Sequence, residues 1–126
     1  SGSGWTSVLL ASIVGDKGKV IGIEIIPELK EFGQRNASNY DFIKNGILKF
    51  VSGDGRQGYS QEAPYDGILC SAGTDSVPPA LEKQLKVGGK IVIPINNSIC
   101  VFTKKPEGNF EKQEYPGFVF VPLVKK

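Results

Sequence analysis

The first 24 residues constrain the fold of this chain more than any other stretch. The opening Ser-Gly-Ser-Gly can turn tightly, because glycine accepts a positive φ and lets a ligand approach the backbone. Residues 5–14 carry apolar side chains at helical spacing, and Gly15 and Gly18 end the predicted helix. Residues 19–24 are an apolar run typical of a buried strand, and their only acid, Glu24, comes last.

A glycine loop, a helix and a strand that ends in an acid form the layout of a nucleoside-binding half-site in an open α/β sheet. In this layout the loop and the helix N-terminus face the ligand, and Glu24 holds the ribose hydroxyls. Ser1–Gly4 alone also suits an engineered linker, but the helix and the strand follow at the spacing that binding requires. Ser7 replaces the third glycine or alanine of the dinucleotide fingerprint, which favours other adenosine-containing ligands over nicotinamide cofactors.

A second acid follows the next predicted strand. A helix is predicted from Pro27 to about Lys44, and a strand at residues 47–52 leads into Gly53-Asp54-Gly55. Ligands bind at the carboxyl edge of such sheets, so Asp54 is expected beside Glu24. A glycine-rich turn with a solvated aspartate explains residues 53–58 equally well by themselves, and the neighbouring Glu24 favours binding.

The rest of the chain predicts more strands than helices. Asp66 is expected at the buried start of a strand at residues 67–72, in a packing role, and Thr74, Asp75 and Ser76 are either substrate contacts or loop and cap residues. Residues 86–90 are predicted to turn after a short helix that starts at residue 77. Strands are then expected at residues 91–95, 98–104, 110–114 and 118–123. This order predicts an α/β fold, with a mostly parallel sheet and antiparallel C-terminal strands.

Composition excludes several classes of protein. The net charge of +2 is scattered, without the basic cluster that nucleic-acid binding needs, and no apolar run could span a bilayer. Without histidine no imidazole can serve as a general base or metal ligand, and no metal site is predicted. Cys70 and Cys100 lack metal-like spacing and are expected to be reduced thiols in a cytoplasmic protein.

The chain lacks methionine, and a glycine loop of this kind normally follows a strand. We therefore expect a single domain over residues 1–126 that is truncated before Ser1 and lacks its first strand. The missing strand would leave inner sheet edges unpaired, which an N-terminal segment or a second chain would complete.

Six segments then occur in one order: SGSGWT (1–6), KVIGIE (19–24), GDGR (53–56), APYDGI (63–68), GGKIVIP (88–94) and FVPLV (120–124). Together they resemble the protein-L-isoaspartate O-methyltransferase family, whose members are class I methyltransferases that use S-adenosylmethionine. Each motif occurs in other class I methyltransferases, but the ordered set is specific, and it covers the whole chain.

The resemblance implies a Rossmann-like fold and methylation of the α-carboxylate of L-isoaspartyl residues in damaged proteins, which is a repair reaction. It implies that Ser71, Ala72, Gly73 and Thr74 line the substrate side. Asp75 departs from the family pattern by placing an acid near a carboxylate substrate. The cofactor-binding residues that the resemblance implies are Gly2, Ser3, Gly4, Glu24, Ile25, Asp54 and Gly55.

An isoaspartyl α-carboxylate has a pKa of about 4, so it is already a nucleophile at neutral pH and needs no general base. Two other functions remain open at this point. One is a different class I methyltransferase that acts on RNA or a small molecule, although the chain has no basic patch for RNA. The other is a non-catalytic remnant that binds cofactor or a partner.

Overall fold

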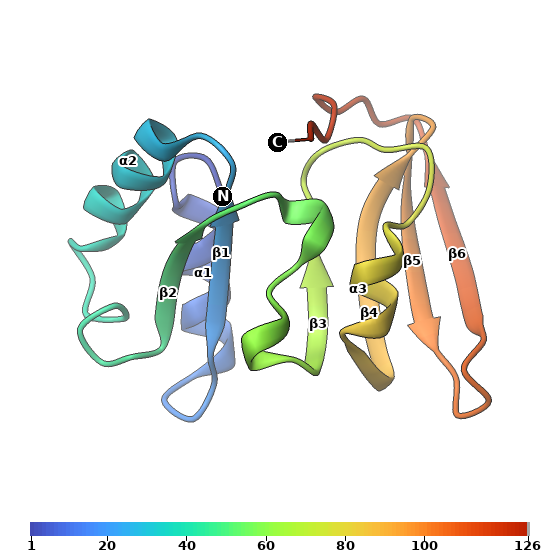
Figure 1. Ribbon diagram of the computed structural model, residues 1–126, viewed down its shortest axis with the longest axis horizontal. Helices are drawn as coiled ribbons and strands as arrows, with labels where there is room; N and C mark the ends of the chain where they lie inside the picture. The colour runs from blue at the N-terminus through green and yellow to red at the C-terminus, as the bar shows by residue number, and fades with distance from the viewer. Residues whose placement is uncertain (126) are drawn as a thin grey trace. The chain divides into compact units, whose positions relative to one another are not determined.

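The computed structural model describes residues 1–125 (Figure 1). An α-helix precedes the first, second and fourth strands, and two 3-10 turns (Gly55–Gln57 and Ser60–Glu62) precede the third. The described residues form two units, residues 1–55 and residues 56–125. The first unit contains α1 (Trp5–Val14), β1 (Val20–Glu24), α2 (Pro27–Ala37) and β2 (Leu48–Ser52). The second contains β3 (Tyr65–Leu69), α3 (Pro79–Lys83), β4 (Leu85–Ile95), β5 (Ser98–Lys104) and β6 (Phe110–Pro116).

In the first unit, β1 and β2 are parallel, in a register that pairs Val20 with Leu48 and Glu24 with Ser52. Both helices pack on this strand pair and on each other. Gly22 is tightly packed, because a Cβ there would lie 3.1 Å from both the Phe50 ring and the Ser7 hydroxyl, and one of these side chains would have to shift slightly. The core of this unit is formed by Val8, Ala11, Val20, Ala37, Ile47, Leu48 and Phe50.

The second unit contains a four-stranded sheet in the order β3-β4-β5-β6 (Figure 1). β3 and β4 are parallel, and β5 and β6 continue the sheet antiparallel. Asn96 and Asn97 have φ values of 48° and 64°, which suit the tight two-residue hairpin between β4 and β5. The core of this unit is formed by Leu81, Leu85, Ile91, Ile93, Ile95 and Cys100.

The predicted order of elements is confirmed as far as β6, as are the parallel pairs and the antiparallel strands β5 and β6. The predicted end of the second helix at about Lys44 is wrong, because α2 ends at Ala37. The Ser38 hydroxyl donates to the Arg35 carbonyl at 2.6 Å, and the side-chain amide of Asn39 donates to the Asn36 carbonyl at 3.1 Å. Such side chains occupy the last helical carbonyls and end the helix.

Three further expectations in the second unit need correction. Residues 118–123 form no strand, and only Pro122 makes an isolated bridge, to Gly73. Residues 86–90 belong to β4, although the register shifts there and Gly88 has a φ of 82°. Asp66 is exposed rather than buried, and it forms a 3.1 Å ion pair with Lys86.

Two further findings concern membrane-spanning helices and the cysteines. No helix within residues 1–125 is long and apolar enough to cross a membrane. Both Cys70 and Cys100 are free thiols.

Candidate functional site

Glu24 lies at the C-terminal end of β1, with only 9% of its surface exposed. Its Oε2 accepts hydrogen bonds from the Gly2 amide at 2.8 Å and from the Ser1 terminal ammonium at 3.0 Å. Its Oε1 accepts one from the Ile26 amide at 3.1 Å. The acid at the strand end therefore contacts the predicted glycine loop directly.

Opposing effects set the pKa of Glu24. Burial raises the pKa, since it disfavours the charged carboxylate. The hydrogen bonds from the Gly2 amide, the Ser1 nitrogen and the Ile26 amide lower it, and the lowering prevails. The pKa of Glu24 therefore lies below its ordinary value, and the side chain is an ionised acceptor at neutral pH.

The glycine loop turns sharply into α1. The Gly4 amide donates to the Ser1 carbonyl at 3.1 Å, and the Gly4 carbonyl accepts from the Val8 amide at 3.0 Å. Gly2 and Gly4 have φ values of 53° and 83°, so both occupy the left-handed region that favours glycine. A Cβ at Gly2 would meet no atom within 4 Å, so the loop is open on that side.

Asp54 lies at the neighbouring strand end, as predicted. The amide of Gly53 donates to the Glu24 carbonyl at 3.0 Å, which brings the start of the Gly53–Gly55 turn against the end of β1. Asp54 and Gly55 are partly buried, and a 3-10 turn begins at Gly55. Ile25 is also partly buried and lies in the bend after Glu24. The first unit thus holds all seven residues predicted to bind the cofactor.

The predicted substrate-side segment lies in the second unit. Thr74 forms a bridge with Ile95, and Gly73 donates to the Val121 carbonyl and accepts from the Leu123 amide, both at 2.7 Å. The Thr74 hydroxyl donates to the Ser76 carbonyl at 3.1 Å, which is a local turn contact. Ser71 is exposed and Ala72 partly buried.

Two groups flank this segment. Burial raises the pKa of the Cys70 thiol, which donates to the Ala72 carbonyl at 3.4 Å. Cys70 is therefore protonated at neutral pH rather than a thiolate nucleophile. The predicted acid, Asp75, is exposed.

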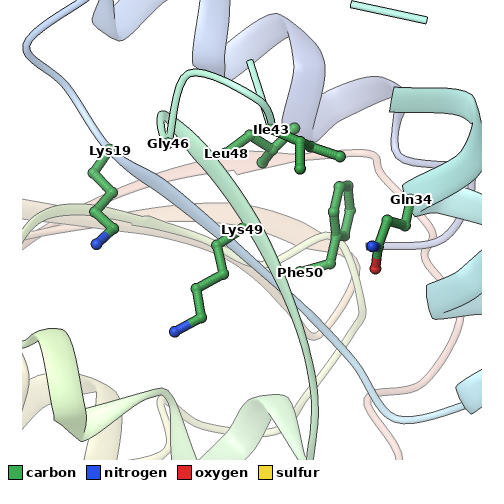
Figure 2. A pocket seen from close by; sticks show the side chains of 7 residues that line it. All are labelled: Lys19, Gln34, Ile43, Gly46, Leu48, Lys49 and Phe50. Atoms are coloured by element: carbon green, nitrogen blue, oxygen red, sulfur yellow. The ribbon is translucent and has the colours of Figure 1, made fainter. Parts of the chain in front are cut away.

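A depression of about 350 Å³ lies elsewhere on the first unit (Figure 2). Figure 2 shows the Phe50 ring between Ile43 and Gln34, while Lys19 and Lys49 extend away from it. None of the residues predicted to bind cofactor or substrate lines this depression. We therefore do not assign it to the candidate site.

Sequence reasoning missed the residues that support the glycine loop from α2. A Cβ at Gly33 would lie 2.7 Å from the Gly2 carbonyl oxygen, so the loop and the helix touch through their backbones. The Asn36 side-chain amide donates to the Ser3 carbonyl at 3.0 Å. In the sequence, Gly33 was visible only as a weak point in the helix, and no local pattern singled out Asn36.

The arrangement fits a ligand with donor hydroxyl groups. Each carboxylate oxygen accepts up to about two hydrogen bonds. Oε2 of Glu24 already accepts two, while Oε1 accepts one and retains capacity. Together with Asp54, this provides acidic acceptors at two adjacent strand ends. Among the described residues, no group of three or more Cys, Asp or Glu side chains is placed to hold a metal ion.

The family model of protein-L-isoaspartate(D-aspartate) O-methyltransferase matches residues 1–126. A protein-L-isoaspartate O-methyltransferase of Methanopyrus kandleri is 38% identical over 128 residues, which are 98% of this chain and 56% of that protein. Its counterpart in Caenorhabditis elegans is 35% identical over 132 residues, which are 100% of this chain and 59% of that protein. The chain therefore spans somewhat more than half the length of these relatives.

Solved structures agree with this match. A protein-L-isoaspartate O-methyltransferase shares a TM-score of 0.75 and 30% identity, over 92% of this chain and 39% of that one. A Plasmodium falciparum protein described as belonging to the same enzyme class has the same TM-score at 25% identity, over 86% of this chain and 53% of that one. It was solved in complex with S-adenosyl-L-homocysteine.

These likenesses confirm the Rossmann-like methyltransferase fold that the sequence predicted. The match to the family model extends over every residue, and both relatives exceed 30% identity. The chain belongs to the protein-L-isoaspartate(D-aspartate) O-methyltransferase family.

Proposed function

We propose that this chain is the cofactor-binding and C-terminal part of an enzyme that methylates L-isoaspartyl residues in damaged proteins. The methyl donor is S-adenosyl-L-methionine, and the acceptor is the α-carboxylate of the isoaspartyl residue. The observation that carries the proposal is the buried, ionised Glu24 against the glycine loop. Membership of the family supplies the reaction and the class of substrate.

The residues of the first unit have distinct roles in this proposal. Glu24 accepts a ribose hydroxyl at Oε1, the oxygen with remaining hydrogen-bonding capacity. Gly2, Ser3 and Gly4 present backbone to the ligand, and the open space beside Gly2 permits close approach. Asp54 accepts from the adenine amino group, with Ile25 and Gly55 beside the adenosine.

The chemistry requires little from the side chains. Bound S-adenosylmethionine supplies an electrophilic methyl group. The isoaspartyl α-carboxylate, with a pKa of about 4, is ionised at neutral pH, so its oxygen would take the methyl carbon without a general base while the carbon–sulfur bond breaks and S-adenosylhomocysteine leaves. The protein's contribution is to hold donor and acceptor in line, which can supply up to about 7–11 kcal/mol of the barrier. Ser71, Ala72, Gly73 and Thr74 line the acceptor side in this proposal.

A methylation assay tests the reaction. The intact protein is incubated with methyl-labelled S-adenosylmethionine and one of two peptides that differ only in an L-isoaspartyl or a normal aspartyl residue. We expect a base-labile methyl ester on the isoaspartyl peptide and none on the aspartyl control. Equal labelling of both peptides, or labelling of RNA or a small molecule instead, would contradict the proposal. The two free thiols also favour a reducing compartment, and we propose the cytoplasm as the place of action.

We also propose that further polypeptide completes the sheet along the edge of β1 that faces away from β2, where no strand of residues 1–125 pairs with it. The Val20 amide and the Glu24 carbonyl both bond toward β2. Backbone groups alternate in direction along a strand, so those of Ile21 and Ile23 face the opposite edge. At that edge the Ser1 nitrogen donates to the Ile23 carbonyl at 2.9 Å.

The occupant we propose is an apolar strand that precedes Ser1 in a longer polypeptide and runs parallel to β1. Ser1 already lies at the C-terminal end of that edge, so such a strand would reach it directly. One side of α1 also exposes Trp5, Leu9 and Ile13, at 59%, 44% and 78%, in a stripe with a spacing of four residues. Covering apolar surface of this kind lowers the free energy of the protein in water.

Amide hydrogen exchange tests this second proposal. The 126-residue chain is compared with the same chain extended at its N-terminus by the corresponding segment of the Methanopyrus kandleri relative. We expect the Ile21 and Ile23 amides to exchange much more slowly in the extended chain, while Lys49 in β2 serves as the internal control. Unchanged exchange, or protection that depends on protein concentration and so indicates a second chain, would contradict the proposed occupant.

A further inference from the structure

The glycine loop is in direct contact with α2 as well as with Glu24. Gly4 has a φ of 83°, and a Cβ there would lie 2.5 Å from the Gly33 carbonyl oxygen. From the other side, a Cβ at Gly33 would lie 2.7 Å from the Gly2 carbonyl oxygen and 3.2 Å from the Gly4 nitrogen. The two backbones are therefore in direct contact, and neither position has room for a side chain.

Asn36 adds a directional contact one helical turn further along α2. Its Nδ2 donates to the Ser3 carbonyl at 3.0 Å across 33 residues of sequence. A backbone carbonyl is only an acceptor, so the amide nitrogen of Asn36 must face it. Asn36 is partly buried, and its backbone carbonyl accepts a hydrogen bond from the side chain of Asn39 at 3.1 Å.

We infer that Asn36 is a positioning residue for cofactor binding, and that Gly33 provides the surface against which the loop rests. This inference rests on the proposed cofactor site. Asn36 acts through the loop and not on the ligand, since its amide is engaged by the Ser3 carbonyl. With Ser3 held by Asn36 and Gly2 held by Glu24, the loop is fixed from both flanks before a ligand arrives. Such preorganisation favours binding because less ordering is needed on association.

Two isosteric substitutions separate this role from general effects on the helix. Asn36→Asp places a carboxylate oxygen against the Ser3 carbonyl, whereas Asn39→Asp adds the same charge three residues away without facing the loop. In the intact protein we expect Asn36→Asp to weaken the binding of S-adenosyl-L-homocysteine about five- to tenfold. Asn39→Asp should bind within about twofold of the wild type, since only the helix end is changed.

Gly33→Ala tests the contact between the two backbones. Alanine is a better helix former than glycine, but the added Cβ would lie 2.7 Å from the Gly2 carbonyl oxygen, so the loop must shift. We therefore expect weaker binding of S-adenosyl-L-homocysteine together with a lower melting temperature. The readout that a merely structural role would not move comes from Asn36→Asp, whose affinity should fall while its melting temperature stays close to that of Asn39→Asp, since each variant loses one side-chain bond to a carbonyl and adds one charge.

Calorimetric titrations of wild type, Asn36→Asp, Asn39→Asp and Gly33→Ala are read beside amide exchange at Gly4 without ligand. We expect faster Gly4 exchange and weaker binding in Asn36→Asp, and neither change in Asn39→Asp. If wild type binds and Asn36→Asp binds equally well, the inference is overturned while the proposed function stands. If wild type itself binds no S-adenosyl-L-homocysteine, the proposed cofactor site fails and the inference fails with it.

Discussion

The backbone amide of Gly53 donates to the carbonyl of Glu24 at 3.0 Å, at the point where β1 and β2 both end. This contact places the turn that carries Asp54 against the strand end that carries Glu24. Glu24 pairs with Ser52, which comes 28 residues later in the sequence, and Asp54 follows directly after that strand. Parallel pairing therefore turns two separate sequence motifs into one acidic edge.

The low pKa of Glu24 predicts how stability depends on pH. The folded state holds this pKa below its unfolded value of about 4.3, so folding favours the ionised carboxylate. Its contribution is fully present above the unfolded pKa and disappears as the pH falls through the lower folded pKa. We expect the free energy of unfolding of wild type, relative to Glu24→Gln, to be constant at neutral pH and to shrink below about pH 4.5. Urea denaturation of both proteins between pH 7 and pH 3 measures it, and a difference that grows on acidification would refute the assignment.

The two loop glycines should respond differently to alanine. Both require a positive φ, which costs an alanine about 1–2 kcal/mol. Gly4→Ala also drives a Cβ to within 2.5 Å of the Gly33 carbonyl oxygen, whereas Gly2→Ala meets nothing within 4 Å. We expect Gly4→Ala to lower the free energy of unfolding clearly more than Gly2→Ala. Equal losses in thermal denaturation would mean that the contact with α2 contributes nothing.

Gln84 should stabilise the loop before β3. Its buried side chain accepts from the Tyr59 amide at 2.9 Å and donates to the Gln57 carbonyl at 2.8 Å. Gln84→Ala leaves both backbone groups without these partners, and we expect a loss of about 2–3 kcal/mol in the free energy of unfolding. Gln61→Ala, at an exposed position in the same segment, is the matched control and should change little. Equal urea-denaturation midpoints for wild type and Gln84→Ala would show that Gln84 does not stabilise this loop.

Lys104 should matter more than its neighbour Lys105. The Lys104 ammonium donates to the carbonyl of Glu82 in the last turn of α3 and to that of Leu85 just beyond the helix, both at 3.0 Å. Replacement by methionine keeps most of the apolar stem and removes both bonds, which should cost about 1–2 kcal/mol. Lys105→Met removes an exposed 2.6 Å ion pair with Glu111 and should lower stability less. A larger loss for Lys105→Met in thermal denaturation would contradict this ranking.

The sequence predicted the elements whose patterns are local. The helix at residues 5–14 and the strand at residues 98–104 have the predicted bounds, because glycines or asparagines mark their ends. Glu24 and Asp54 were found because parallel strands place their carboxyl ends together. The fold class followed from the order of these elements.

The predictions that were wrong or missing concern features that depend on contacts beyond the local sequence pattern. Residues 118–123 have the composition of a strand, yet their extended backbone is held by Asn97 and Gly73 rather than by a neighbouring ladder. The end of α2 depends on the side chains of Ser38 and Asn39, which hydrogen-bond to backbone carbonyls in the last turn of the helix. Helix propensity alone does not predict where this end lies. The hydrogen bond from Asn36 to the loop connects residues that are 33 positions apart, and no local sequence pattern predicts it.

The most direct test of the account is calorimetric titration of the intact protein with S-adenosyl-L-homocysteine, for wild type and Glu24→Gln. Glutamine keeps the shape of the side chain but loses the charge that the buried carboxylate carries at neutral pH. We predict binding by the wild type and at least about tenfold weaker binding by the folded variant, since bonds to a charged acceptor are the stronger ones. Equal affinity of the two proteins, or no binding by either, would contradict the claim that Glu24 and the glycine loop form the cofactor site.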